Sequence, residues 1–172
     1  MTAPHRTYRY VGPADVRAAT VGAPAGTQLR TAEDLANWLV RLPAGELAEP
    51  FTYVVDPAGV LRLAPRRSEH VACAAGQRVL AAGEIGFGRV GGRWVVEQVS
   101  NQSTGYCPDV VSWPAVARAL DRVGIDRPEG FTHAVVFRRC TACGECSVVR
   151  DGHFVCVFCD AKLPPGWNVD PG

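Results

Sequence analysis

The stretch FTYVVDPAGVLRL, residues 51–63, decides the fold of this chain. It contains two β-rich runs, residues 51–55 and 60–63, and between them DPAG, whose Asp, Pro and Gly are typical turn residues. Two short apolar runs joined by such a turn predict a β-hairpin. A hairpin pairs its strands antiparallel, so the chain is expected to build an antiparallel sheet around this stretch.

The sequence on either side predicts a second hairpin and two helices. Residues 78–90 and 93–99 are separated by Gly91-Gly92, and two glycines supply the positive φ angles that a tight hairpin turn demands. Thr31-Ala-Glu-Asp34 resembles a capping box, and apolar residues follow it at helical spacing. Ser112-Trp-Pro predicts the second helix, with a serine cap and proline in the first turn.

These elements favour an α+β fold in which two helices flank an antiparallel sheet of hairpins, followed by a small C-terminal zinc ribbon. Residues 132–137 are expected to form a strand that leads into the ribbon, and a short helix is expected around residues 15–19. The predicted organisation is an extended lead-in (1–30), an α+β domain (31–136), a zinc ribbon (137–165) and a tail (166–172).

Composition indicates an ordinary globular protein. The chain has 172 residues, 47% of them hydrophobic, and a formal net charge of +1, which gives no global reason to expect nucleic acid or membrane as a partner. No apolar run approaches the roughly 20 residues that span a bilayer, and the first residues lack the apolar core of a secretory signal. We therefore expect a cytoplasmic protein. Lys162 is the single lysine among 18 basic residues, which suggests a GC-rich bacterial genome.

The clearest chemical motif is CTACGECSVVRDGHFVCVFC, residues 140–159. Its outer CxxC pairs supply four thiolates at a spacing suited to tetrahedral zinc, while Asp151-Gly152 between them predicts a tight hairpin. Gly144 and Asp160 follow the two pairs, and both residue types tolerate the left-handed turn that each pair needs. The predicted ligands are Cys140, Cys143, Cys156 and Cys159.

An alternative ligand set replaces the first pair by Cys143 and Cys146. That set leaves only nine residues for the hairpin and makes the two halves of the ribbon unequal, so we favour the outer set. Cys146 and His153 are then bystanders. A closed set of four thiolates has no open position for water or substrate, so the expected zinc ion is structural.

A polar segment, residues 66–108, is the candidate ligand-binding or catalytic surface of the main domain. Polar loops at the end of a rigid sheet are common places for functional sites. If the segment is catalytic, its residues should converge around one pocket. The candidate catalytic residues are His70, Glu84, Asn101, Ser103 and Tyr106.

Residues 70–108 also resemble a conserved pattern of plant IQ-motif calmodulin-binding proteins. The matching positions are His70, Gly76, the Ala-Ala-Gly run at 81–83, and Ser-x-x-Tyr-x-Pro at 103–108. The chain departs from that pattern after His70, where Val-Ala replaces two serines, and at position 105, where glycine replaces histidine. It has no IQ helix, which removes the reason to expect calmodulin. The resemblance implies a shared domain fold.

Three functions are compatible with this sequence. The first is a binding or adaptor module that contacts a protein partner, or a small-molecule ligand, through residues 66–108 and the ribbon. The second is a small transferase for a nucleotide-like substrate, in which His70 and Tyr106 hold the ligand and Glu84 polarises a hydroxyl. The third is a nucleic-acid-associated factor, which predicts an arginine stripe that joins Arg138, Arg139 and Arg150 to Arg66 and Arg67. We favour the first.

Overall fold

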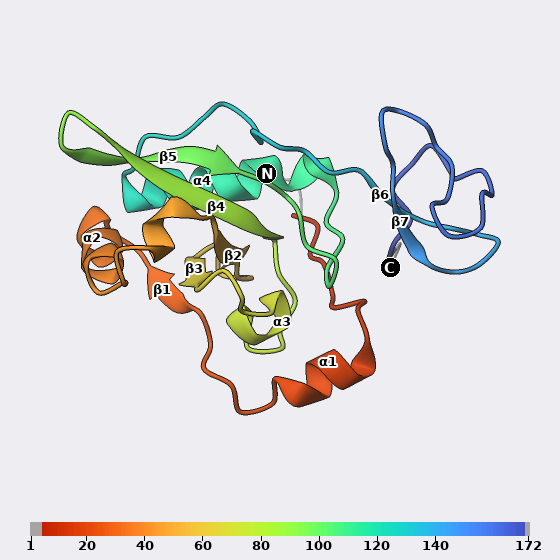
Figure 1. Cartoon of the computed structure of the whole chain (residues 1–172), viewed down its shortest axis with the longest axis horizontal. Coiled ribbons are helices and arrows are strands. Elements are labelled where there is room, and N and C mark those ends of the chain that lie inside the picture. Colours follow the sequence, from red (N-terminus) through yellow and green to blue (C-terminus); the bar gives the residue numbers. More distant parts are fainter. Residues whose placement is uncertain (1–4, 171–172) are drawn as a thin grey trace.

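The computed structural model describes residues 5–170 and has the expected α+β fold (Figure 1). Five strands form one antiparallel sheet in the order β1-β3-β2-β4-β5. Their bounds are β1 (Thr27–Leu29), β2 (Phe51–Val55), β3 (Leu61–Ala64), β4 (Ala81–Val90) and β5 (Arg93–Val99). The helices are α1 (Ala14–Ala19), α2 (Ala32–Val40), α3 (His70–Cys73) and α4 (Trp113–Val123). Two short 3₁₀ turns, η1 (Glu46–Ala48) and η2 (Val110–Ser112), precede β2 and α4.

Both predicted hairpins are confirmed. The strands β2 and β3 pair antiparallel, with Val55 opposite Leu61, and β4 and β5 pair up to the turn at Gly91 and Gly92. These glycines have φ angles of 57° and 79°, in the left-handed region that favours glycine, and two consecutive positive φ angles match the right-handed twist of the flanking strands.

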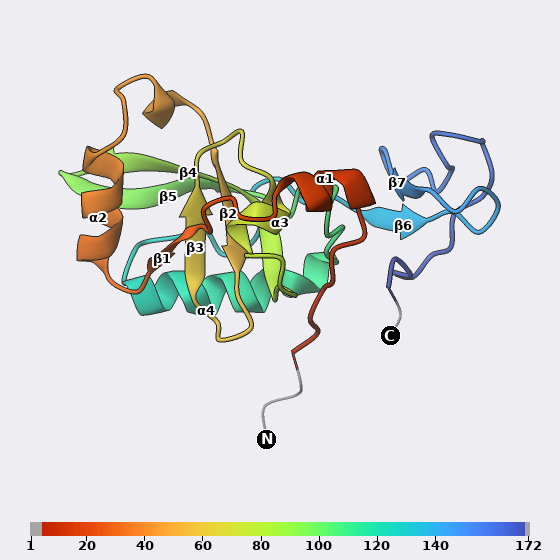
Figure 2. The same cartoon turned by 90° about the horizontal axis from the view of Figure 1, so that it is seen from below.

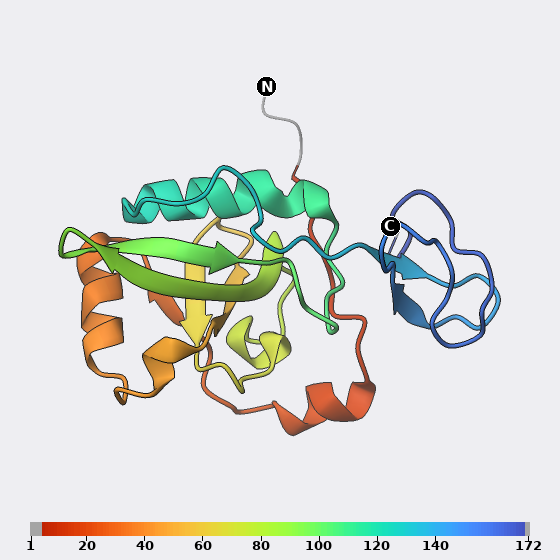
Figure 3. The same ribbon diagram turned by 45° about the horizontal axis from the view of Figure 1, so that its top comes forward.

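The central strand β2 is buried on both faces, which matches its lack of charged residues and its run of aromatic and β-branched side chains. Phe51, Tyr53 and Val55 belong to the main core, which α2 and α4 cover with Leu35, Leu39, Val116 and Leu120. Val54 belongs to a second core on the opposite face, together with residues of α3 and of the N-terminal segment. In Figures 2 and 3, α4 runs along one face of the sheet while α3 lies on the other.

Helix prediction is right for α2 and partly wrong for α4. At α2 the capping box is complete, because the Thr31 side chain accepts from the Asp34 N–H and the Asp34 carboxylate accepts from the Thr31 N–H. At α4, Ser112 occupies the cap position without capping. It is already in the 3₁₀ turn η2, and its hydroxyl donates to the Asp109 carbonyl at 2.7 Å.

Two further expectations about strands need correction. Residues 132–136 form no regular strand beyond an isolated bridge between His133 and Ser100, and β6 (Phe137–Arg139) begins only at the end of the predicted run. The strand β1 lies inside the predicted lead-in, where its three residues are too few to show an alternating pattern. The helix predicted around residues 15–19 is confirmed as α1.

The chain just after β5 passes β4 with almost no clearance at Gly83. A Cβ atom placed on Gly83 would lie 2.0 Å from the carbonyl oxygen of Ser100, so only glycine fits where these two backbones meet. The Tyr53 hydroxyl donates to the same Ser100 carbonyl at 2.7 Å. The end of β5 is thereby fixed against the middle of the sheet.

The C-terminal part forms a second, small sheet at one end of the molecule (Figure 1). In it β6 pairs antiparallel with β7 (Cys146–Val148). The last described residues return to the sheet domain, where the Trp167 indole packs edge-on against Tyr8 and Asp170 forms ion pairs with Arg9 and Arg78. None of the helices within residues 5–170 combines the length and the apolar character needed to cross a bilayer.

Candidate metal centre

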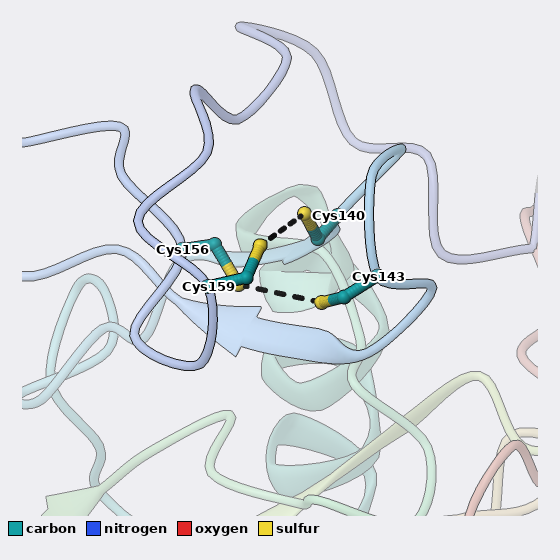
Figure 4. A group of neighbouring side chains, drawn as sticks. All are labelled: Cys140, Cys143, Cys156 and Cys159. Atoms are coloured by element: carbon teal, nitrogen blue, oxygen red, sulfur yellow. Dashed lines mark hydrogen bonds between the residues drawn. The ribbon is translucent and has the colours of Figure 1, made fainter.

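Four cysteine sulfurs converge in the C-terminal part, and they are those of the outer set (Figure 4). All four sulfur atoms lie within 4.8 Å of one another. The Cys140 and Cys159 sulfurs are 3.6 Å apart, and those of Cys143 and Cys156 are 3.7 Å apart. The four cysteines are therefore placed to bind one metal ion.

The two CxxC pairs form matching turns. In the first, the Gly144 N–H donates to the Cys140 carbonyl and the Cys140 N–H to the Glu145 carbonyl, at 2.9 and 2.8 Å. In the second, the Asp160 N–H donates to the Cys156 carbonyl at 3.0 Å and the Cys156 N–H to the Ala161 carbonyl at 2.8 Å. The residues after each pair, Gly144 and Asp160, have φ angles of 79° and 60°, as the sequence predicts.

The set of four cysteines suits a cation, because the four thiols cannot all lose their protons without a positive charge beside them. The backbone N–H of Cys143 lowers the pKa of the Cys140 thiol to about 6. For Cys143, the Glu145 N–H lowers the pKa, but desolvation and contacts with the other three sulfurs together raise it to about 12. One thiol thus ionises at the expense of its neighbours. A divalent cation removes this conflict, since it stabilises all four thiolates at once.

The hairpin between the pairs is only partly as predicted. Asp151 and Gly152 form the tight turn, with φ angles of 51° and 71° and a hydrogen bond from the His153 N–H to the Arg150 carbonyl at 2.9 Å. However, β7 pairs with β6, and across the turn only Arg150 and His153 form a bridge. The pairing partner of β7 comes from before the first CxxC pair, which a local pattern does not reveal.

The candidate catalytic side chains in the main domain are largely held by backbone groups. The His70 Nε2 is 2.9 Å from the Gly83 carbonyl oxygen, and the Tyr106 hydroxyl donates to the Gln77 carbonyl at 2.7 Å. The Ser103 hydroxyl accepts from the Tyr106 N–H at 3.3 Å, and Asn101 bridges two backbone segments. These bonds give the four side chains structural roles, and the transferase hypothesis stays a prediction.

Glu84 lines a pocket with a histidine that sequence reasoning missed. The pocket has a volume of about 100 Å³, and His133, Ser100 and Thr132 also line it. The pairing of Ser100 with His133 brings the histidine to this place. The two residues are far apart in the chain, and no motif in the sequence connects them.

Two of the three arginines of the ribbon, Arg138 and Arg139, hold backbone carbonyls. Arg138 is buried and donates to the carbonyls of Phe137, Pro164 and Pro165 at 2.8–3.2 Å. The Arg139 guanidinium donates to the Gly144 carbonyl at 2.8 Å. In the sheet domain, Arg66 forms an ion pair with Glu49 at 2.6 Å. These contacts weaken the case for an arginine stripe that binds nucleic acid.

Comparison with known proteins identifies no relative, so a function can be proposed only from the geometry of the site. No protein-family model, curated protein or solved structure matches the chain. The similarity of residues 70–108 to plant IQ-motif proteins stays a prediction.

The position of His70 leads to a pH-dependent stability. Burial lowers the pKa of His70 below its ordinary value near 6.5, and the hydrogen bond to Gly83 opposes this shift only in part. Because the folded pKa lies below the unfolded one, the unfolded chain takes up the proton first as the pH falls. This contribution to stability is complete above pH 6.5 and is lost as the pH decreases toward the folded pKa, with a slope of at most about 1.4 kcal/mol per pH unit.

We expect His70→Gln to reduce this pH dependence. Glutamine retains a donor for the Gly83 carbonyl but does not titrate. Urea unfolding between pH 7.5 and 5.5 should therefore show a smaller loss of stability for His70→Gln than for the unmodified protein. The exposed His133 provides the control, since His133→Gln should follow the unmodified protein. Equal slopes for all three proteins would contradict the assignment to His70.

Proposed function

We propose that this chain is a zinc-ribbon binding module that contacts a protein partner. The sulfur spacing supports zinc as the metal, because a tetrahedral ion with Zn–S bonds of about 2.3 Å places its ligands about 3.8 Å apart. The observed 3.6 and 3.7 Å agree with this value. A full set of thiolates occupies every position of a tetrahedral ion, so we assign the zinc a structural role.

The observation that carries the partner proposal is the exposure of apolar side chains at the second CxxC pair. Phe158 is 64% exposed, and Val157 and Val155 are 49% and 46% exposed. A large aromatic side chain in water gains nothing for the fold, but on a rigid support it can anchor a protein contact. The turn that carries Phe158 and Val157 is fixed by its own hydrogen bonds and by the metal ligands on either side.

The surface of residues 66–108 is proposed as a second contact. Arg66 and Arg67 line a groove of about 360 Å³ with Phe51, Glu46 and Glu49. The groove has an apolar floor and charges of both signs, which suits a polar peptide segment or a small charged ligand. The proposal includes a cytoplasmic location, where cysteines stay reduced and available to metal.

The test compares Phe158→Ser with a matched control. Val90 is 65% exposed at the tip of the β4–β5 hairpin, so Val90→Ser removes a similar apolar group far from the ribbon in sequence. Proteins that bind the zinc-loaded chain would be identified by affinity capture and mass spectrometry, and the strongest would then be purified for a Kd measurement.

We expect Phe158→Ser to weaken the purified pair at least about tenfold, or roughly 1.4 kcal/mol, while Val90→Ser leaves the Kd unchanged. Both variants should retain zinc, since neither residue is a ligand. Equal affinity for Phe158→Ser and the unmodified chain would exclude the ribbon as the contact surface.

A further inference from the structure

The junction between the sheet domain and the ribbon contains two cysteines that the metal site does not use. Cys107 belongs to the loop after β5, and Cys146 is the first residue of β7. They share one apolar cluster with Val135, Phe137 and Val169, which come from the connecting segment, the ribbon and the tail. Cys146 packs against the cluster that contains Cys107, and each thiol shifts the pKa of the other.

Cys107 is held in a conformation that most residues avoid. Its φ angle is 44°, in the left-handed region that favours glycine. Hydrogen bonds hold it there: its N–H donates to the Ser103 carbonyl at 2.7 Å, and its carbonyl accepts from the Trp167 indole N–H at 2.9 Å. The loop and the tail thus fix the Cys107 backbone, and its thiol donates to the Thr104 carbonyl of the same loop at 3.3 Å.

Cys146 is the more reactive of the two. Its side chain is partly exposed, whereas Cys107 is buried. The neighbouring Cys107 thiol and the charge of Arg139 lower the pKa of the Cys146 thiol to about 7. Cys146 and burial together raise the pKa of the Cys107 thiol. A partly exposed thiol with a lowered pKa near a second thiol is an arrangement found in redox-sensitive cysteine pairs.

We propose that Cys107 and Cys146 form a reversible disulfide that locks the ribbon against the sheet domain. The position of the pair at the junction means that one covalent bond would join the loop after β5 to β7. The zinc ligands take no part in it, so the metal centre stays intact while the two parts of the molecule become fixed to each other.

The disulfide forms with a hydroperoxide as the oxidant. The Cys146 thiolate attacks one oxygen of hydrogen peroxide, the O–O bond breaks, and the products are a sulfenic acid and hydroxide, which takes up a proton to become water. The Cys107 sulfur then attacks the Cys146 sulfur, the S–O bond breaks, and the hydroxyl leaves with the Cys107 proton as a second water. Both electrons given up by the thiol pair reduce the peroxide. A dithiol reductant reverses the change by thiol–disulfide exchange.

The test treats the zinc-loaded full chain with one equivalent of hydrogen peroxide. Intact-mass spectrometry should show the loss of two hydrogen atoms, and tandem spectrometry should place the cross-link between Cys107 and Cys146. A zinc-release assay on the same sample should detect no release. Hydrogen exchange of residues 132–136, which connect the two parts, should become at least about fivefold slower after oxidation and recover after reduction.

Single variants separate this pair from other thiols. Cys107→Ser and Cys146→Ser should each abolish the cross-link, while Cys73→Ser, a buried thiol of the second core, should leave it unchanged. The proposal is overturned if the unmodified, zinc-loaded chain forms no cross-link. It is also overturned if Cys146 cross-links to a zinc ligand with release of zinc, or if oxidation leaves exchange in residues 132–136 unchanged.

Discussion

Serine in place of Cys140 is expected to unfold residues 140–163 and to leave the five-stranded sheet intact. The ribbon has little core of its own, since the buried residues of its apolar cluster are Cys140, Cys156 and Leu163. Ordering each residue costs about 1.5 kcal/mol, which so few buried side chains cannot offset. Structural zinc in comparable sites contributes about 10–16 kcal/mol. Removing one ligand should forfeit much of this energy.

Three measurements together check this expectation. Elemental analysis should find one zinc per chain in the unmodified protein and much less in Cys140→Ser. Amide hydrogen exchange should lose protection in residues 140–163 but retain it in β2 and β4, and a chelator should reproduce that result in the unmodified protein. Cys146→Ser is the control. Cys146 is not one of the four converging cysteines, so this variant should keep its zinc. Full zinc and full protection in Cys140→Ser would contradict a four-cysteine site.

The elements that sequence reasoning predicted well depend on short stretches of chain. The hairpin at residues 51–63 has its turn chemistry between its two strands, and the capping box at Thr31 is complete within four residues. The CxxC pairs are equally local, because each fixes its own turn through a residue with a positive φ angle. In each case the residues that determine the structure are neighbours in the sequence, so the pattern can be read directly.

The features that sequence reasoning missed depend on contacts between distant residues. The pairing of β7 with β6 joins segments on either side of the first CxxC pair. Glu84 and His133 line one pocket because Ser100 pairs with His133. Ser112 was mispredicted for a different, local reason: it has the residue type of a cap, but η2 turns the backbone before the helix begins. A residue's type limits what it can do, whereas its partners depend on the whole fold.

Asn101 also has a partner that is distant in the sequence, Val135, and Asn101→Ala is expected to destabilise the sheet domain strongly. The side chain is fully buried, and it makes three hydrogen bonds to the backbone. Its Nδ2 donates to the carbonyls of Pro108 and Val135 at 3.0 and 2.7 Å, and its Oδ1 accepts from the Val135 N–H at 2.6 Å. Alanine would leave these groups without this partner in the interior. At about 1–3 kcal/mol for each buried group, we expect a total loss of about 3–5 kcal/mol.

Urea unfolding should show this loss, and two further variants test its cause. Asn101→Asp retains an acceptor for the Val135 N–H but turns a carboxylate oxygen toward two carbonyl oxygens, so it should be at least as destabilising as alanine. Gln102→Ala removes an exposed amide from the next residue and should change stability by less than about 0.5 kcal/mol. If Asn101→Ala unfolds like the unmodified chain, its side chain is not needed to join the loop after β5 to Val135.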